Sequence, residues 1–129
     1  MEQHTLEYDG ARFTFANTMR AMLRYRIMVG RLELRTVEGQ EVEHYVPGKF
    51  AYPDQPDYDL RRDFCWVIVH LESVDGWDGW KIPRETDTAQ QFEASMNEFA
   101  DRVDWGAFRG VFEPFITEMK RANAGGLAP

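Results

Sequence analysis

Residues 4–15 read HTLEYDGARFTF and decide the N-terminal part of the fold. On both sides of Asp9-Gly10, apolar and polar residues alternate, which is the period of a half-buried β-strand. Asp-Gly tolerates the positive φ angles of a two-residue type I′ turn, so the segment predicts a β-hairpin. An isolated two-stranded hairpin is marginal in water, so its apolar face must pack on other elements. The residues of that face are Leu6, Tyr8, Phe13 and Phe15.

Residues 19–37 admit two structures. Apolar residues recur at every third or fourth position, which predicts one amphipathic helix. Gly30 costs roughly 1 kcal/mol inside such a helix. The alternative ends the helix near Val29 and pairs residues 32–37 with residues 42–46 as a second hairpin. We favour the long helix, and for residues 31–46 the hairpin stays open.

Three prolines separate these elements from the rest of the chain. Each proline lacks a backbone N–H and breaks a helix, so residues 46–56 predict a structured loop or a linker. Beyond the loop, apolar residues at helical spacing over residues 60–74 predict a central helix. We expect the following side chains of this helix and of the next to meet in the core: Leu60, Phe64, Val67, Leu71, Phe92, Met96 and Phe99.

Two more helices are expected at the C-terminal end. Residues 88–91 read TAQQ and match the capping box that begins a helix. Asp104 can cap the last helix, which Pro114 kinks or restarts. Residues 123–129 lack periodicity and predict a flexible tail. The sequence therefore predicts one domain over residues 1–122, an α+β fold that is mainly α, with the N-terminal hairpin packed on about four helices.

Composition limits the function classes. The chain has 129 residues, of which 43% are hydrophobic, enough for one core without disulfides or metal. The formal charge of −7 repels phosphate backbones and disfavours nucleic-acid binding. The single cysteine excludes an intrachain disulfide, and neither a signal peptide nor a membrane-spanning run is present, so we expect a cytoplasmic protein.

The sequence nominates no catalytic or metal site. The three histidines lack ligand spacing, and Cys65 has neither a base nor an orienting group at a suitable position. The aspartates after the proline loop do not have the spacing of a calcium loop, so turn and capping roles are expected for them. We therefore predict no enzymatic activity, no metal and no cofactor.

Aromatic residues are the candidates for protein binding. Trp77 and Trp80 lie in a Gly-rich turn, where each ring either closes the core or faces a partner. Phe112 and Phe115 are the next candidates, because nine Phe, four Trp and six Met are more than a small core easily buries. The alternative is that all four pack internally or that a homo-oligomer buries them.

The layout resembles the tail assembly chaperones of long-tailed bacteriophages. The shared features are the hairpin around Asp9-Gly10, the proline segment, a helix around Trp66, the tryptophan turn and two final helices. The resemblance implies a protein that binds the tape measure protein, with the tail tube protein as a possible further partner. It also implies action in the host cytoplasm, and genes of this family often yield a longer frameshifted form.

Two other function classes stay open. A small acidic inhibitor that imitates nucleic acid would present a continuous acidic face, but arginines are interspersed along this chain. An enzyme subunit or small-molecule binder would gather polar residues inside a cavity, and the sequence names none.

Overall fold

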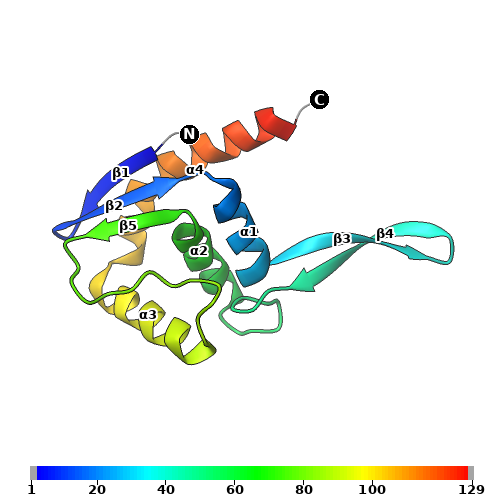
Figure 1. Cartoon of the computed structure of the whole chain (residues 1–129), viewed down its shortest axis with the longest axis horizontal. Coiled ribbons are helices and arrows are strands. Elements are labelled where there is room, and N and C mark those ends of the chain that lie inside the picture. Colours follow the sequence, from blue (N-terminus) through cyan, green and yellow to red (C-terminus); the bar gives the residue numbers. More distant parts are fainter. Residues whose placement is uncertain (1–2, 128–129) are drawn as a thin grey trace.

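The structure is a computed structural model that describes the backbone of residues 3–127 and the side chains of residues 3–118. This part of the chain forms four helices and five strands (Figure 1). In chain order they are β1 (Gln3–Tyr8), β2 (Ala11–Ala16), α1 (Met19–Met28), β3 (Gly30–Val37), β4 (Gln40–Pro47), α2 (Tyr58–Val69), β5 (Leu71–Asp75), α3 (Ala89–Arg102) and α4 (Trp105–Leu127).

The expected N-terminal hairpin is confirmed. Strands β1 and β2 pair antiparallel with Tyr8 opposite Ala11, and Asp9 and Gly10 form the turn with φ angles of 49° and 73°. Phe13 and Phe15 are fully buried on the inner face of β2. The two-residue turn sets the register, and the alternation of the sequence predicted the buried face of β2.

The central helix is shorter than the periodicity predicted. α2 ends at Val69, and Leu71–Asp75 forms strand β5, which pairs antiparallel with β2 in a sheet of order β1-β2-β5. By spacing alone, Leu71 could either continue the helix or begin a strand. The free edge of β2 is the feature that decides for the strand, since its backbone groups need partners.

The second hairpin, and not the long helix, is correct for residues 31–46. α1 ends at Met28, and β3 pairs with β4 across a turn in which Glu38 and Gly39 have φ angles of 51° and 79°. Gly30 has a φ of 137°, which a helix does not allow. Helices make up 43% of the structure and strands 28%, so the expectation of a mainly α fold with one hairpin is wrong. The fold is a mixed one with two antiparallel sheets.

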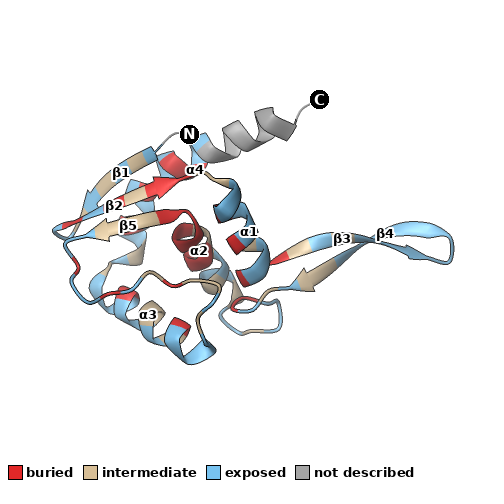
Figure 2. Ribbon diagram, viewed as in Figure 1, coloured by how far each residue is buried: buried red, intermediate tan, exposed pale blue. Residues whose placement is uncertain are grey.

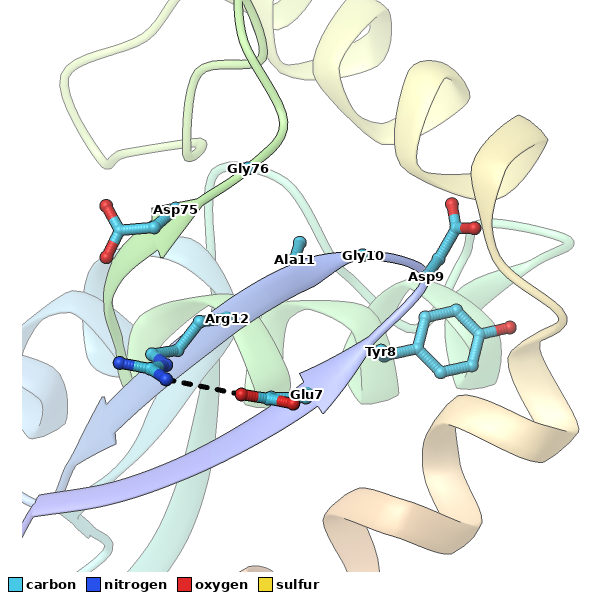
Figure 3. Close-up of a pocket in the computed structure, with 8 residues that line it drawn as sticks. All are labelled: Glu7, Tyr8, Asp9, Gly10, Ala11, Arg12, Asp75 and Gly76. Atoms are coloured by element: carbon cyan, nitrogen blue, oxygen red, sulfur yellow. Dashed lines mark hydrogen bonds and ion pairs between the residues drawn. The ribbon is translucent and has the colours of Figure 1, made fainter.

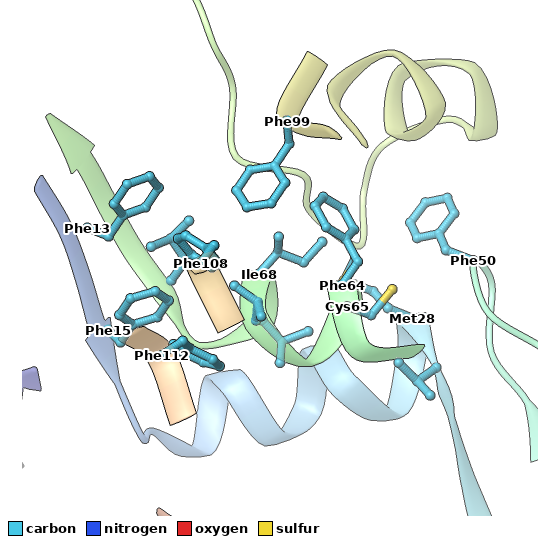
Figure 4. Packing of buried hydrophobic residues seen from close by; sticks show 14 of the residues in the cluster. Phe13, Phe15, Met28, Phe50, Phe64, Cys65, Ile68, Phe99, Phe108 and Phe112 are labelled. Carbon is cyan, nitrogen blue, oxygen red and sulfur yellow. The ribbon is translucent and has the colours of Figure 1, made fainter. Parts of the chain in front are cut away.

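The core lies between the three-stranded sheet and helices α2, α3 and α4. Phenylalanine rings from the sheet and these helices point toward one another (Figure 4). Phe64 contacts Phe99 with 5.1 Å between ring centroids and Phe92 with 6.0 Å, as expected for a helix that meets α3. Leu60 was assigned to the same face, but it is exposed, so that assignment is wrong.

The loop or linker predicted over residues 46–56 begins two residues later, because Val46 and Pro47 belong to β4. Its first residues close the C-terminal end of α1: the amides of Gly48, Lys49 and Phe50 donate to carbonyl oxygens of residues 27–29 over 2.8–2.9 Å. The ring of Phe50 then stacks on Phe92 of α3, with 4.2 Å between centroids. The segment thus joins α1 to the core and fixes the point where the second hairpin leaves it.

The β3–β4 hairpin, called here the β3–β4 ribbon, projects from this body. Figure 1 shows it reaching away from the other elements, and Figure 2 shows most of its length exposed. The hydroxyl of Tyr45 holds its base by donating to the carbonyl oxygen of Val29 over 2.8 Å. Gly30 leaves the room for this hydroxyl, because a Cβ there would lie 2.6 Å from it.

The C-terminal elements begin where the caps predicted. Thr88 and Gln91 form the capping box of α3, and Asp104 accepts a hydrogen bond from the amide of Ala107 at the start of α4. α4 contains Pro114 and does not restart there. It includes residues 123–127 of the segment expected to be a loose tail, and residues 128–129 lie outside the described part.

Candidate functional site

The four aromatic candidates for partner binding all lie in the core. Trp77 is 3% exposed and Trp80 is 8% exposed, and Phe112 and Phe115 are buried as well. The indole N–H of Trp80 donates to the carbonyl oxygen of Ser95 over 3.0 Å. In this fold none of the four rings faces outward to a partner. They pack internally, which was the alternative to partner binding.

The structure brings these residues together in two pairs. The rings of Trp77 and Trp80 meet edge to face at 5.7 Å, and both contact Phe99 of α3. Phe112 and Phe115 of α4 pack against Phe15 of the sheet. The Gly-rich turn therefore folds the tryptophans back over the core.

The exposed apolar side chains are elsewhere, and one group lies on α1. Met19, Met22, Leu23 and Ile27 are each about half or more exposed, and their spacing places them on one side of the helix. The other side of α1 packs on the body through Ala21, Arg24 and Met28. The α1 outer face is defined here as Met19, Met22, Leu23, Arg26 and Ile27.

A second group lies on the β3–β4 ribbon. Leu32 is 63% exposed and Leu34 is 68% exposed, and both are on one face because they are two residues apart in a strand. Val37 and Val42 are exposed on the opposite face. The ribbon begins two residues after α1 ends, so the two apolar groups are neighbours along the chain.

Sequence reasoning missed both groups because it assigned them to a buried stripe. Met19, Leu23, Ile27 and Leu34 share the spacing of a long amphipathic helix, and a helix of that length would have covered them against the core. The signal for the observed structure was the pair of glycines at Gly30 and Gly39.

Several arginines on the rest of the surface form ion pairs with carboxylates. Arg61 contacts the carboxylates of Asp57 and Glu93, and Arg109 contacts those of Asp63 and Glu113. These pairs interrupt the acidic surface on α2, α3 and α4. A nucleic-acid mimic would need a continuous acidic face, so the arrangement does not favour it.

A shallow hollow lies at the tip of the β1–β2 hairpin beside the end of β5 (Figure 3). Glu7 forms an ion pair with Arg12 over 3.3 Å, and the carboxylates of Asp9 and Asp75 point to opposite sides. The polar groups do not converge on a common point. No group of three or more His, Cys, Asp or Glu within the described residues has the arrangement of a metal site.

Two buried titratable residues, Cys65 in α2 and His70 directly after it, pack in the protein interior. Burial raises the pKa of the Cys65 thiol to about 12, so the thiolate needed for nucleophilic attack does not form at neutral pH. His70 is 2% exposed, and its Nδ1 donates to the carbonyl oxygen of Trp66 over 2.8 Å. Burial lowers the pKa of His70, and the hydrogen bond to Trp66 and the charge of Glu72 oppose that effect.

Comparison with protein-family models, with curated proteins and with solved structures gives no significant match for this chain. Within the described residues, none of the helices combines the length and the apolar character needed to cross a lipid bilayer.

Proposed function

We propose that this chain is a non-enzymatic protein-binding chaperone whose partner contacts the α1 outer face and the β3–β4 ribbon. The position of the exposed apolar side chains carries the proposal. Of the eleven large hydrophobic residues exposed in the described part of the chain, eight lie on α1 and the ribbon. Gathered apolar surface of this kind is typical of sites that bind proteins.

The shape of the ribbon supports the same function. A two-stranded ribbon with little body contact is marginal in water, and a partner packed along it would supply the missing apolar contacts. Both edges of the β3–β4 sheet also carry unpaired backbone groups, because the sheet has only two strands. A partner segment can therefore bind the ribbon through its apolar side chains, through its backbone groups or through both.

The specific form of the proposal is a tail assembly chaperone of a long-tailed bacteriophage. The layout of the sequence resembles that family, and the implied partner is the tape measure protein in the host cytoplasm, with the tail tube protein as a further partner. A chaperone for a long apolar chain needs surface that accepts varied side chains. The methionines of the α1 outer face suit that role, since Met repacks at low cost.

Co-expression with the phage's tape measure protein tests the proposal. We expect the tape measure protein to stay soluble and to co-purify with the wild-type chain. The double variant Leu32→Thr/Leu34→Thr keeps strand propensity but removes apolar surface, and it should lose the complex. The matched control is Leu60→Gln/Val111→Gln, which changes two exposed apolar residues elsewhere and should keep the complex.

The outcome against the proposal is equally definite. If the wild-type chain neither co-purifies with the tape measure protein nor keeps it soluble, the chaperone function is wrong. If the ribbon variant and the control variant lose the complex equally, the contact does not lie on the ribbon.

A further inference from the structure

Two arginines of α1 differ from the other arginines of the described residues. Arg20 and Arg26 are exposed and form no ion pair, hydrogen bond or ring contact among the residues that the structure describes. Each of the others has a carboxylate, a backbone carbonyl or an aromatic ring as partner. These are Arg12, Arg24, Arg31, Arg35, Arg61, Arg62, Arg84, Arg102 and Arg109.

This difference stands out because the chain has carboxylates in excess. The sequence contains 22 Asp and Glu against 15 Lys and Arg, yet α1 contains no acidic residue at all. Arg26 lies within the α1 outer face, and Arg20 lies at its border beside Ile27. Among the side chains of residues 3–118, four exposed large apolar ones thus lie on α1, a helix that is locally basic on an acidic protein.

We propose that the α1 outer face binds an amphipathic helix of the partner that carries Asp or Glu beside its apolar stripe. This inference rests on the proposed function and names the chemistry of the bound segment. Guanidinium groups bind carboxylates by paired hydrogen bonds, and those bonds strengthen where apolar contacts exclude water. Apolar side chains at positions i, i+3, i+4 and i+8 form the ridges on which a second helix packs.

Two other occupants fit the face less well. A second copy that used the same face would place arginines against arginines. A helix that lies on a membrane has its basic residues opposite its apolar residues, whereas here both are on one face. The net charge of −7 would also repel the whole molecule from anionic lipid.

A displayed library of helical peptides tests the inference directly. Every peptide has the same Leu and Met stripe, and the flanking positions vary among Glu, Gln and Lys. We expect selection on the full-length protein to enrich Glu over Lys at least tenfold. The double variant Arg20→Glu/Arg26→Glu should reverse this preference, and its fold should persist because both residues are exposed.

Each result decides the question. Equal enrichment of Glu and Lys, or a preference that charge reversal leaves unchanged, overturns the inference. If the wild-type protein binds phosphatidylserine vesicles and the charge-reversed variant does not, the ligand of the α1 outer face is a membrane and not a helix. If light scattering shows a dimer for the wild type and a monomer for the variant, the α1 outer face binds a second copy of this chain.

Different experimental results would contradict this inference and the proposed function. If the tape measure complex forms and survives Arg20→Glu/Arg26→Glu, the chaperone function stands and the acidic helix is wrong. If no tape measure complex forms while acidic peptides bind the α1 outer face, the chaperone function is wrong and the acidic specificity stands.

Discussion

The indole N–H of Trp77 donates to the backbone carbonyl oxygen of Asp9 over 3.3 Å. The bond joins the loop after β5 to the turn of the N-terminal hairpin. The Trp77 ring also meets Phe13 edge to face at 5.1 Å, and the guanidinium of Arg102 lies 4.2 Å above it. The hairpin turn is thus fixed to the core by a residue 68 positions away.

We expect Trp77→Ala to lower the free energy of unfolding by about 3–5 kcal/mol, because the ring is buried and its removal leaves a cavity. Urea denaturation measures this change. Trp77→Phe keeps part of the packing and should lose clearly less. A loss below about 1 kcal/mol for the alanine variant would mean that the ring does not close the core.

The sequence predicted the first hairpin completely and the second only as an alternative. Around Asp9-Gly10 the turn residues and the period of two agree, so local information is sufficient. Around Glu38-Gly39 the apolar residues also fit a helix, and the first turn position holds Glu in place of the Asn, Asp or Gly that this turn prefers. The two glycines, Gly30 and Gly39, were the local signal for the hairpin, and they competed with the helical spacing of the apolar residues.

Gly48 is the residue that allows the segment after β4 to close the end of α1. A Cβ at this position would lie 2.4 Å from the backbone carbon of Val29 and 2.5 Å from that of Met28. We expect Gly48→Ala to destabilise the protein by about 1–3 kcal/mol, measured by urea denaturation. Gly110→Ala is the control: its Cβ has open space inside α4, so it should stabilise by about 0.5–1 kcal/mol. Equal effects of the two variants would contradict the close approach.

The hydroxyl of Tyr45 should hold the ribbon base. Burial and the hydrogen bond with Tyr58 raise the pKa of Tyr45, so its hydroxyl keeps its proton and donates to Val29. Tyr45→Phe removes this bond and should weaken the ribbon by about 1 kcal/mol. Hydrogen exchange should then become faster across β3 and β4 and stay unchanged in β1 and β2.

The matched control for this variant is Tyr52→Phe, because the hydroxyl of Tyr52 has no partner within the described residues. It should leave exchange in the ribbon at the wild-type rate. Unchanged exchange in the Tyr45 variant would show that the ribbon base depends on backbone contacts alone.

The candidate surface was less predictable than the core. Periodicity marks which residues share a face, but it does not tell whether that face is covered. For α2 and α3 the face at Phe64 and Phe99 is covered, as expected. For α1 the face at Leu23 and Ile27 is exposed. The same spacing therefore predicts a shared face correctly in α1, α2 and α3, and only the packing of the whole fold decides which face is buried.

Stability should fall as the pH drops through the ordinary range of histidine, because of His70. Burial lowers the pKa of His70 in the folded state. As the pH falls through about 6.5, the unfolded chain therefore takes up a proton that the folded chain does not. Because the unfolded chain binds more protons than the folded chain, a lower pH stabilises the unfolded state, and the free energy of unfolding falls. Urea denaturation at several pH values should show this loss for the wild type and a smaller one for His70→Gln. A loss of stability that is as large in His70→Gln as in the wild type would disprove the role of His70.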